Sequence, residues 1–215
     1  MIKYIRKLLP KEFVVGLSSG VDSLAVAHFL KFQAYKKFTV FHFNHLSENH
    51  NDFQAENCAV KFCNDFNIPL VLLRADRPLE NEAESREGRL NAFNAHFHNT
   101  NLIMAHHLLD SVESHYMNFF KGKEAHLPIP LKSQFGSNTI WHPFLTTDKS
   151  DFESYVKENK LESYLAIDPT NFESDFTMRN WVRNTVIPEV ETKQIINMKT
   201  IVRKRIIKAV SNMPL

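Results

Sequence analysis

Residues 14–23 read Val-Val-Gly-Leu-Ser-Ser-Gly-Val-Asp-Ser, and a run of small apolar residues follows from Leu24. The apolar segment predicts a short buried strand, the Ser/Gly segment a turn, and the run after it a helix. Backbone N–H groups at a helix start carry partial positive charge, and Ser18, Ser19 and Gly20 are small enough to let an anion approach. This junction therefore predicts a phosphate-binding site and favours a nucleotide as its ligand.

The turn differs from two common nucleotide-binding motifs. A Walker loop needs a Gly-Lys pair, yet no lysine lies between Lys11 and Lys31, and the dinucleotide motif Gly-x-Gly-x-x-Gly is also absent. A capping box, with Ser19 as N-cap and Asp22 three residues later, explains the same residues without any ligand. Taken alone, the junction leaves both interpretations open.

Short apolar runs alternate with helix-length segments along the rest of the chain. We expect strands at 12–17, 38–44, 70–74 and 102–105, and helices at 22–33, 52–66, 82–99 and 108–120. This alternation predicts an α/β fold, a doubly wound parallel sheet with helices on both faces. Ligands of such sheets bind beyond the carboxyl ends of the strands. Polar segments follow three of the expected strands, at 18–23, 42–45 and 106–107.

The remainder of the chain predicts a helical extension. We expect a nucleotide-binding core at 1–145 and an extension at 146–215, with helices at 148–159, 178–189 and 195–210. Residues 123–134 are expected to form a loop that moves around the substrate, and turns are expected at 136–138 and 168–171.

Composition narrows the class of protein. The net charge is +2, but six cations and no acid follow Glu191, so the rest of the chain carries −4. The last helix is therefore either a polyanion-binding surface or a solvated amphipathic helix with the apolar stripe Ile195, Met198, Val202, Ile206 and Val210. No apolar run has the roughly 20 residues that span a bilayer, and no signal peptide is evident. Cys58 and Cys63 are not spaced for a disulfide or a metal site. We expect a cytoplasmic protein without a membrane partner, and a homodimer is compatible with the sequence.

A second cluster lies where the fourth strand gives way to its helix. His106, Asp110 and Glu113 are spaced to share one helical face. Asp22 and Asp110 are hard oxygen ligands that suit Mg²⁺ bound to a nucleotide, and His106 is suited to offsetting phosphate charge or moving a proton. We interpret His107 as a core imidazole with a satisfied hydrogen bond.

Two arginine pairs follow helical spacing. Arg86 and Arg89 lie three residues apart, and Arg179 and Arg183 lie four apart. Guanidinium groups suit bidentate phosphate contacts, but arginines interspersed with glutamates are more often an exposed salt-bridged face. Neither pair alone indicates a binding site.

The combination of motifs is more specific than its parts. In chain order, the sequence resembles the tRNA(Ile)-lysidine synthetase family of N-type ATP pyrophosphatases over roughly residues 13 to 190. The segments that carry the resemblance are Ser18-Ser19-Gly20-Val21-Asp22-Ser23, 42–45, 82–89, 105–113, Pro143-Phe144-Leu145, Asp168-Pro169-Thr170-Asn171, and 179–183 with Pro188. The family uses a doubly wound α/β domain whose Ser-Gly-Gly-x-Asp-Ser loop holds ATP phosphates.

The resemblance implies a two-step reaction at the wobble cytidine of a CAU anticodon. ATP adenylates the C2 carbonyl oxygen and releases pyrophosphate, and the amine of lysine then attacks C2 and expels AMP. The implied ligands are ATP, Mg²⁺, lysine and the CAU-anticodon isoleucine tRNA. By position, the implied roles are ATP binding by Ser18, Ser19, Gly20, Val21, Asp22, Ser23, Asn44 and His45; metal binding by Asp22 and Asp110; catalysis by Asp22, Arg86, His106, Asp110 and Arg183; and tRNA binding by Arg89, Arg179, Arg203, Lys204 and Arg205.

The sequence departs from the family pattern at three positions. Ser19 replaces the first Gly of the loop, Leu109 stands where an acid or amide usually precedes Asp110, and His142 stands where Arg usually precedes Pro143. Many family members also continue into C-terminal domains that grip the tRNA. Two alternatives follow, an ATP pyrophosphatase that adenylates another substrate and a nucleotide or RNA binder without turnover. Thiolation of tRNA is disfavoured because Cys58 and Cys63 do not supply the usual cysteine pair.

Overall fold

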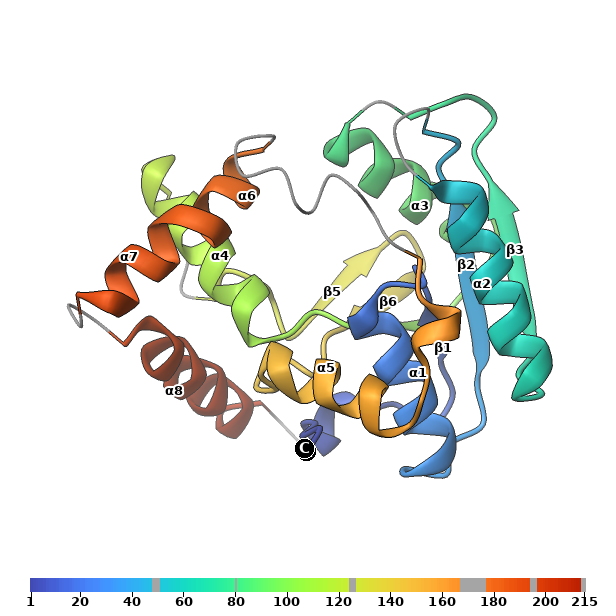
Figure 1. The fold of residues 1–215 in the computed structure, drawn as a ribbon, viewed down its shortest axis with the longest axis horizontal. Coiled ribbons are helices and arrows are strands. Elements are labelled where there is room, and N and C mark those ends of the chain that lie inside the picture. The colour runs from blue at the N-terminus through green and yellow to red at the C-terminus, as the bar shows by residue number, and fades with distance from the viewer. Residues whose placement is uncertain (48–50, 80, 124–126, 167–176, 194–196, 214–215) are drawn as a thin grey trace.

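The fold is built on one six-stranded sheet with the strand order β3-β2-β1-β4-β6-β5 (Figure 1). It is seen in a computed structural model that describes residues 1–47, 51–79, 81–123, 127–166, 177–193 and 197–213. The strands β1, β2, β3, β4 and β6 run parallel, and β5 pairs with β6 in the antiparallel sense. The predicted doubly wound parallel sheet is confirmed.

The elements lie close to the predicted ranges. The strands are β1 Val14–Gly16, β2 Thr39–Asn44, β3 Leu70–Arg74, β4 Asn101–Ile103, β5 Lys132–Phe135 and β6 Asn138–Trp141. The helices are η1 Arg6–Leu8, α1 Val21–Phe32, α2 Asp52–Asp65, α3 Glu82–His96, α4 Leu108–Phe120, α5 Lys149–Glu158, η2 Glu162–Tyr164, α6 Met178–Trp181, η4 Val182–Val186, α7 Ile187–Thr192 and α8 Met198–Ser211.

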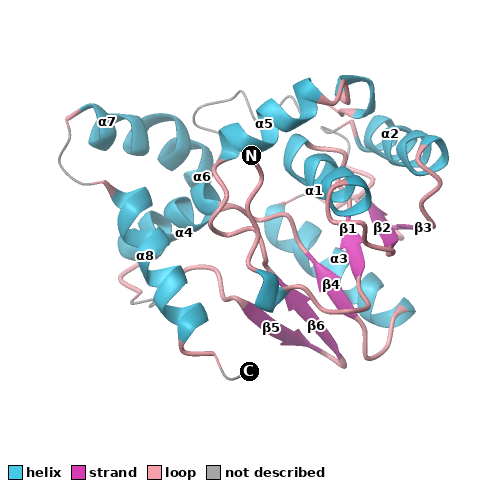
Figure 2. Cartoon of the chain, turned by 90° about the horizontal axis from the view of Figure 1, so that it is seen from below, coloured by secondary structure: helices cyan, strands magenta, loops and turns pink. Residues whose placement is uncertain are grey.

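Helices cover both faces of the sheet, as Figure 2 shows from below. One face packs against α1, α2 and α5 through a cluster that includes Val15, Leu24 and Phe152. The other face packs against α3 through Phe41 and Phe93, whose ring centroids are 5.2 Å apart. Because β1 and β2 are covered on both faces, their residues are almost all buried, including His42 and Asn44. Helix α5, from the predicted extension, thus packs within the main core.

The carboxyl ends of β1 and β4 mark the switch point of the sheet. From β1 the chain winds outward through β2 and β3, then returns to place β4 on the other side of β1. Connections therefore leave β1 and β4 toward opposite faces, which opens a crevice between the following loops. The segments after these strands are the two that carry the predicted phosphate turn and His106.

Two local predictions were wrong. Part of the expected loop at 123–134 is strand, because residues 132–135 form β5 and join β6 through a tight turn with Gly136 at φ +59°. The strand was missed because its polar sequence lies at the sheet edge. The single helix expected at 178–189 is instead three consecutive segments, of which η4 is π-helical. Pro188 at the start of α7 has no N–H to donate back into the preceding turn, which favours the wider winding.

A third apolar cluster joins the last helices to α4. Val202 and Ile206 of α8 are buried against residues of α4 such as Val112. The apolar stripe of α8 therefore packs inward where the structure describes it. Ile195, which we assigned to the same stripe, and the turn predicted at 168–171 lie outside the described residues. Cys58 and Cys63 are both free. Among the helices described, none is long and apolar enough to cross a membrane.

Candidate functional site

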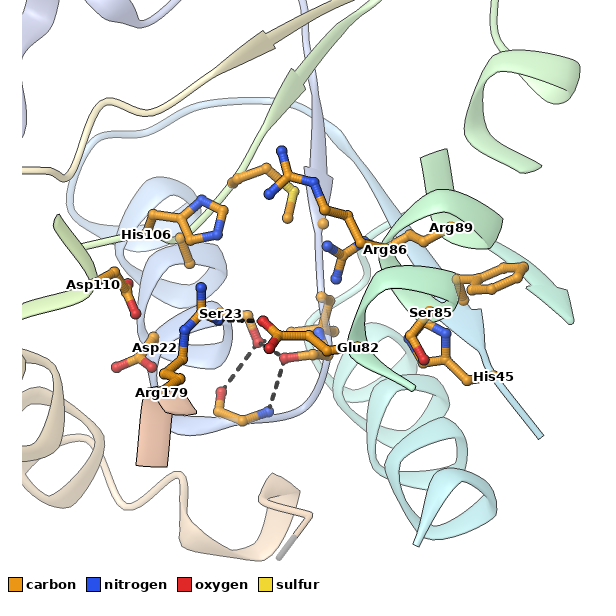
Figure 3. Close-up of a pocket in the computed structure, with 17 residues that line it drawn as sticks. Asp22, Ser23, His45, Glu82, Ser85, Arg86, Arg89, His106, Asp110 and Arg179 are labelled. Carbon is orange, nitrogen blue, oxygen red and sulfur yellow. Dashed lines mark hydrogen bonds and ion pairs between the residues drawn. The ribbon is translucent and has the colours of Figure 1, made fainter. Parts of the chain in front are cut away.

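A cavity of about 310 Å³ lies at the carboxyl ends of β1 and β4. Figure 3 shows Asp22 and Asp110 on one side of it, and Ser85, Arg86, Arg89 and His45 on the other. The elements around it are β1, α1, α3, the β4–α4 segment and α6. Its lining is Gly16, Leu17, Ser18, Gly20, Asp22, Ser23, Phe43, His45, Glu82, Ser85, Arg86, Arg89, Met104, Ala105, His106, Asp110 and Arg179.

The turn before α1 is braced by its own hydroxyl groups. Ser23 Oγ accepts a hydrogen bond from the backbone N–H of Ser18 at 3.1 Å and also contacts the carbonyl oxygen of Gly20 at 3.1 Å. The N-cap of α1 is Gly20, and it provides no side-chain cap. The alternative of a capping box from Ser19 was therefore wrong. A helix start without a side-chain cap leaves backbone donors available for an anion.

Ser19 shapes the turn without lining the cavity. Its backbone is in the left-handed region, with φ 60°, and its hydroxyl donates to the carbonyl oxygen of Ala55 at 2.7 Å. The side chain is 1% exposed. The position thus has the conformation that favours the Gly found in the family, and here a hydrogen bond to α2 offsets part of the strain.

Asp22 is surrounded by two cationic or hydrogen-bonding groups. Lys149, at the start of α5, donates to both carboxylate oxygens at 3.1 Å. His107 Nε2 lies 3.6 Å from Asp22 Oδ1. Burial raises the pKa of Asp22, but His107 and Lys149 together lower it below its ordinary value. The group is therefore an anion before any ligand binds.

His107 joins the two predicted metal-binding carboxylates. It is 1% exposed and is the N-cap of α4, with Nδ1 accepting from the backbone N–H groups of Leu109 and Asp110. Asp110 Oδ2 accepts in return from the backbone N–H of His107 at 2.8 Å. Since Nδ1 accepts, the hydrogen lies on Nε2 and faces Asp22. The prediction that His107 is a buried imidazole with a satisfied hydrogen bond is confirmed. The same ring also positions Asp22 beside Asp110.

The opposite side of the cavity carries arginines. Arg89 is half-buried there, and this desolvation lowers its pKa to about 10. Arg179 is paired with Glu82 at 2.5 Å, whereas neither Arg86 nor Arg89 has an ion pair with any carboxylate that the structure describes. The Nε atom of Arg89 also has no hydrogen-bond partner among those residues. Because a desolvated guanidinium nitrogen without an acceptor is costly, this side of the cavity is built for an anion.

His106 is a neutral imidazole in this setting. Burial, together with the charges of the nearby arginines, places the pKa of His106 well below its ordinary value. Its ring centroid is 4.9 Å from that of His142. Within the described part of the chain, the Nδ1 atom of His106 has no hydrogen-bond partner. At neutral pH the group is therefore uncharged and does not offset phosphate charge.

Several predicted residues do not line the cavity. Asn44 is buried and donates to Glu56 at 2.8 Å. Arg183 donates to both carboxylate oxygens of Glu113, from Nε at 2.6 Å and from Nη2 at 3.0 Å, so its catalytic contact with substrate stays a prediction. Glu113, which we expected on the face of His106, is fully buried beneath the cavity. Val21 and Ser19 are also absent from the lining.

The predicted tRNA-binding arginines are divided between the cavity and the surface. Arg89 and Arg179 line the cavity. On α8, Arg203 is paired with Asp148 at 2.6 Å, Lys204 is exposed and Arg205 is half-buried. The basic helix thus presents fewer free cations than its sequence indicated.

The two remaining departures from the family pattern fit their surroundings. Leu109 is partly buried and packs in the apolar cluster formed by α4 and α8. His142 donates from Nδ1 to the carbonyl oxygen of Pro130 at 2.7 Å, and burial lowers its pKa to about 4. His142 is therefore neutral where the family usually has an arginine.

Two residues of the site were missed by sequence reasoning. Lys149 follows an ordinary helix start and lies 127 positions from Asp22, so no local pattern indicated the contact. Glu82 lies in the segment 82–89 that carries part of the resemblance, but its pairing with Arg179 depends on how α3 and α6 pack. Of the described residues, no group of three or more His, Cys, Asp or Glu is placed to hold a metal ion by itself.

Comparison with known proteins agrees with this geometry. The chain is 29% identical over 211 residues to the tRNA(Ile)-lysidine synthase of Buchnera aphidicola subsp. Acyrthosiphon pisum (strain APS), which covers 92% of this chain and 46% of that protein. It is 31% identical over 202 residues to the tRNA(Ile)-lysidine synthase of Bacillus licheniformis, covering 87% and 42%. The chain thus spans about half the length of the curated relatives it matches.

A solved structure and a family comparison extend the likeness. The fold is similar to that of the U34-tRNA thiolase NcsA from Methanococcus maripaludis, with a TM-score of 0.69 at 16% identity over 97% of this chain and 77% of that one. At this identity the likeness concerns the fold alone. Residues 2–190 match the family described as the PP-loop domain. The chain belongs to the PP-loop domain family.

Proposed function

We propose that this chain is an ATP pyrophosphatase that modifies tRNA, and that its reaction is lysidine formation on the wobble cytidine of a CAU-anticodon isoleucine tRNA. The observation that carries the proposal is the convergence in one cavity of an uncapped helix start, two carboxylates, and two arginines that have no ion pair among the described residues. The names of the similar curated proteins and the ordered motifs support the choice of substrate.

The nucleotide phosphates would lie at the start of α1. Ser18, Gly20 and Ser23 line the cavity there, and the N-terminal dipole of α1 favours negative charge. On the opposite side, Arg86 and Arg89 would bind the α-phosphate or pyrophosphate with their guanidinium forks. Ser19 would contribute through its left-handed backbone, since its hydroxyl is bound to α2.

The site fits a magnesium ion that arrives with the nucleotide. Asp22 and Asp110 both line the cavity and flank the same imidazole, each 3.6 Å from one of its nitrogens. Two carboxylates suit Mg²⁺, which completes its coordination with water and phosphate oxygens. When bound, the ion would offset charge on the phosphates. Lys149 holds Asp22 in the ionised form that such a ligand requires.

The two steps place different demands on the side chains. In the first, the C2 oxygen of cytidine attacks the α-phosphorus, a P–O bond forms, and the bond to pyrophosphate breaks. Positive charge from Arg86 and Arg89 would stabilise the leaving pyrophosphate. Adenylation is needed because an amide-like oxygen is a poor leaving group, whereas AMP is a good one.

In the second step, the lysine nitrogen forms a bond to C2, and the bond between C2 and the adenylated oxygen breaks to release AMP. The attacking nitrogen must lose a proton. His106 is neutral and lines the cavity, and its buried Nδ1 atom has no hydrogen-bond partner among the described residues. It is therefore the group we assign to accept that proton.

Transfer of radiolabelled lysine to RNA tests the proposal. The protein is incubated with ATP, Mg²⁺, labelled lysine and a CAU-anticodon tRNA, and a tRNA with another wobble base serves as the matched control. We expect label only on the first RNA, together with one pyrophosphate per lysine. No label, under conditions where a known lysidine synthase transfers it, would refute the assignment. Pyrophosphate release with another acceptor would identify a different adenylated substrate, and ATP binding without release would indicate a binder without turnover.

A further inference from the structure

Four exposed apolar side chains gather where the end of α4 meets α6. Phe119 is 72% exposed, Phe120 and Met178 are each 44% exposed, and Trp181 is 38% exposed. The ring centroids of Phe119 and Phe120 are 5.9 Å apart, and those of Phe120 and Trp181 are 5.4 Å apart. Among the described residues, Phe119, Phe120 and Trp181 are the exposed large aromatic rings that contact one another. We name Phe119, Phe120, Met178 and Trp181 the aromatic patch.

The aromatic patch lies on the same two helical elements, α4 and α6, that carry residues of the cavity lining. Arg179, which lines the cavity, lies in the chain between Met178 and Trp181. At the other end of α4, Asp110 also lines the cavity. Nine residues of helix separate Asp110 from Phe119, which corresponds to about 14 Å along the axis. Figure 1 shows the end of α4 beside α6, above the bundle of α7 and α8.

Two cationic side chains adjoin the aromatic patch along the chain. Lys121 and Lys123 directly follow α4 and are exposed. Neither has an ion pair with a carboxylate in the described part of the chain. The nearby acids of α7 are already neutralised, because Glu189 is paired with Lys193 at 3.0 Å, and Glu191 is paired with Lys199 at 2.9 Å.

We propose that the aromatic patch binds unpaired bases of an RNA loop by stacking, while Lys121 and Lys123 contact its phosphates. The proposal rests on the proposed function, since it assigns a surface to the RNA whose base would enter the cavity. Exposed rings with flanking cations are the combination that binds single-stranded nucleic acid, because every base has a face to stack and every linkage carries a charge. A docked protein segment would gain less from the two lysines.

Binding of an RNA hairpin with a CAU loop tests the proposal. The hairpin carries a fluorescein label, its affinity is measured by anisotropy, and a duplex of the same stem is the control RNA. Phe119→Ala is expected to weaken hairpin binding about fivefold to a hundredfold and to leave duplex binding unchanged. The matched control is Tyr35→Ala, which removes a ring that is 85% exposed at the end of α1.

Fluorescence of Trp181 gives a second measurement. Stacking on a base should quench it, so the hairpin should reduce the emission of the wild type but not that of Trp181→Phe. This variant keeps a ring and should retain most of the hairpin affinity. The emission of Trp141 remains in both proteins and serves as an internal reference.

The outcomes separate this inference from the proposed function. Unchanged hairpin affinity of Phe119→Ala, equal loss of duplex binding, or a changed oligomeric state in sedimentation would each overturn the stacking surface. If the wild type binds the hairpin through the patch but transfers no lysine, the proposed function fails and the stacking surface stands. If lysine transfer proceeds and Phe119→Ala binds normally, only the stacking surface fails.

Discussion

Replacing Arg183 with Met tests whether this arginine supports the fold or acts on substrate. Glu113 has a side chain that is 0% exposed, and Arg183 contacts both of its oxygens at 2.6 and 3.0 Å. Burial raises the pKa of Glu113, and Arg183 opposes that rise. Without Arg183, the nearest described cation is Arg179, with its Nε at 3.8 Å from Glu113.

The expected loss can be worked from these contacts. Leaving one member of a buried ion pair uncompensated costs about 3–5 kcal/mol of unfolding free energy. We expect about 3 kcal/mol, because Arg179 remains and Glu113 can take up a proton. For a domain of this size, that corresponds to a decrease in Tm of roughly 6–12 °C. Urea unfolding followed by circular dichroism measures the free energy directly.

Two further variants make the result decisive. The double variant Glu113→Gln/Arg183→Met removes both charges and should recover most of the loss. Arg203→Met breaks the pair with Asp148, which is 2.6 Å long but partly exposed at both ends, and should cost less than about 1 kcal/mol. If Arg183→Met unfolds like the wild type yet no longer releases pyrophosphate, the structural role assigned to Arg183 is wrong.

Four other outcomes are expected. Asp110→Asn should keep the hydrogen bond at the start of α4 and lower the rate of pyrophosphate release at least 100-fold. Asp110→Ala should in addition lose about 1 kcal/mol of unfolding free energy. An active Asp110→Asn enzyme would contradict the role assigned to the charge of Asp110. Ser19→Ala should lose about 1 kcal/mol in urea unfolding, and Ser19→Gly should stay near the wild type, because relief of the positive φ offsets the lost hydrogen bond. Burial lowers the pKa of His28, so the unfolded chain binds a proton at this imidazole more readily than the folded chain does. The free energy of unfolding should therefore fall as the pH decreases below about 6.5. His28→Gln should flatten that pH dependence in unfolding curves measured between about pH 7 and 5. Lys149→Met should strengthen Mn²⁺ binding in the absence of ATP, because Asp22 loses its counter-ion; calorimetric titration that shows equal or weaker binding would refute this.

The fold was accessible from the sequence because its signals are local. Apolar runs alternate with helix-length segments, and each of the four expected strands starts or ends within three residues of an observed one. The edge strand β5 was not accessible, because a strand that is half exposed and polar has neither the composition nor the alternation of a core strand. The π-helical turn before Pro188 was missed because periodicity does not distinguish it from an α-helix.

The candidate site was accessible only where topology determines it. Residues that follow β1 and β4 must meet at the switch point, so Ser18, Asp22, His106 and Asp110 could be assigned to one place before any coordinates were known. The partner of a charged side chain is not determined in this way. The spacing of Arg179 and Arg183 on their helix is the same whether Arg183 faces the substrate or a buried acid. The sequence therefore does not distinguish these two partners.

The distribution of counter-ions in the cavity gives the assignment its physical basis. On one side, Asp22 is balanced by Lys149 and held by His107. On the other, Arg86 and Arg89 have no carboxylate partner in the described residues, and desolvation of Arg89 already shifts its pKa to about 10. An ordinary salt-bridged surface would have paired these arginines with the glutamates that surround them in sequence. Asp22 and Arg179 each have a partner of opposite charge, whereas Arg86 and Arg89 have none among the described residues. Their side of the cavity therefore favours a ligand with several negative charges, and a nucleotide triphosphate supplies them.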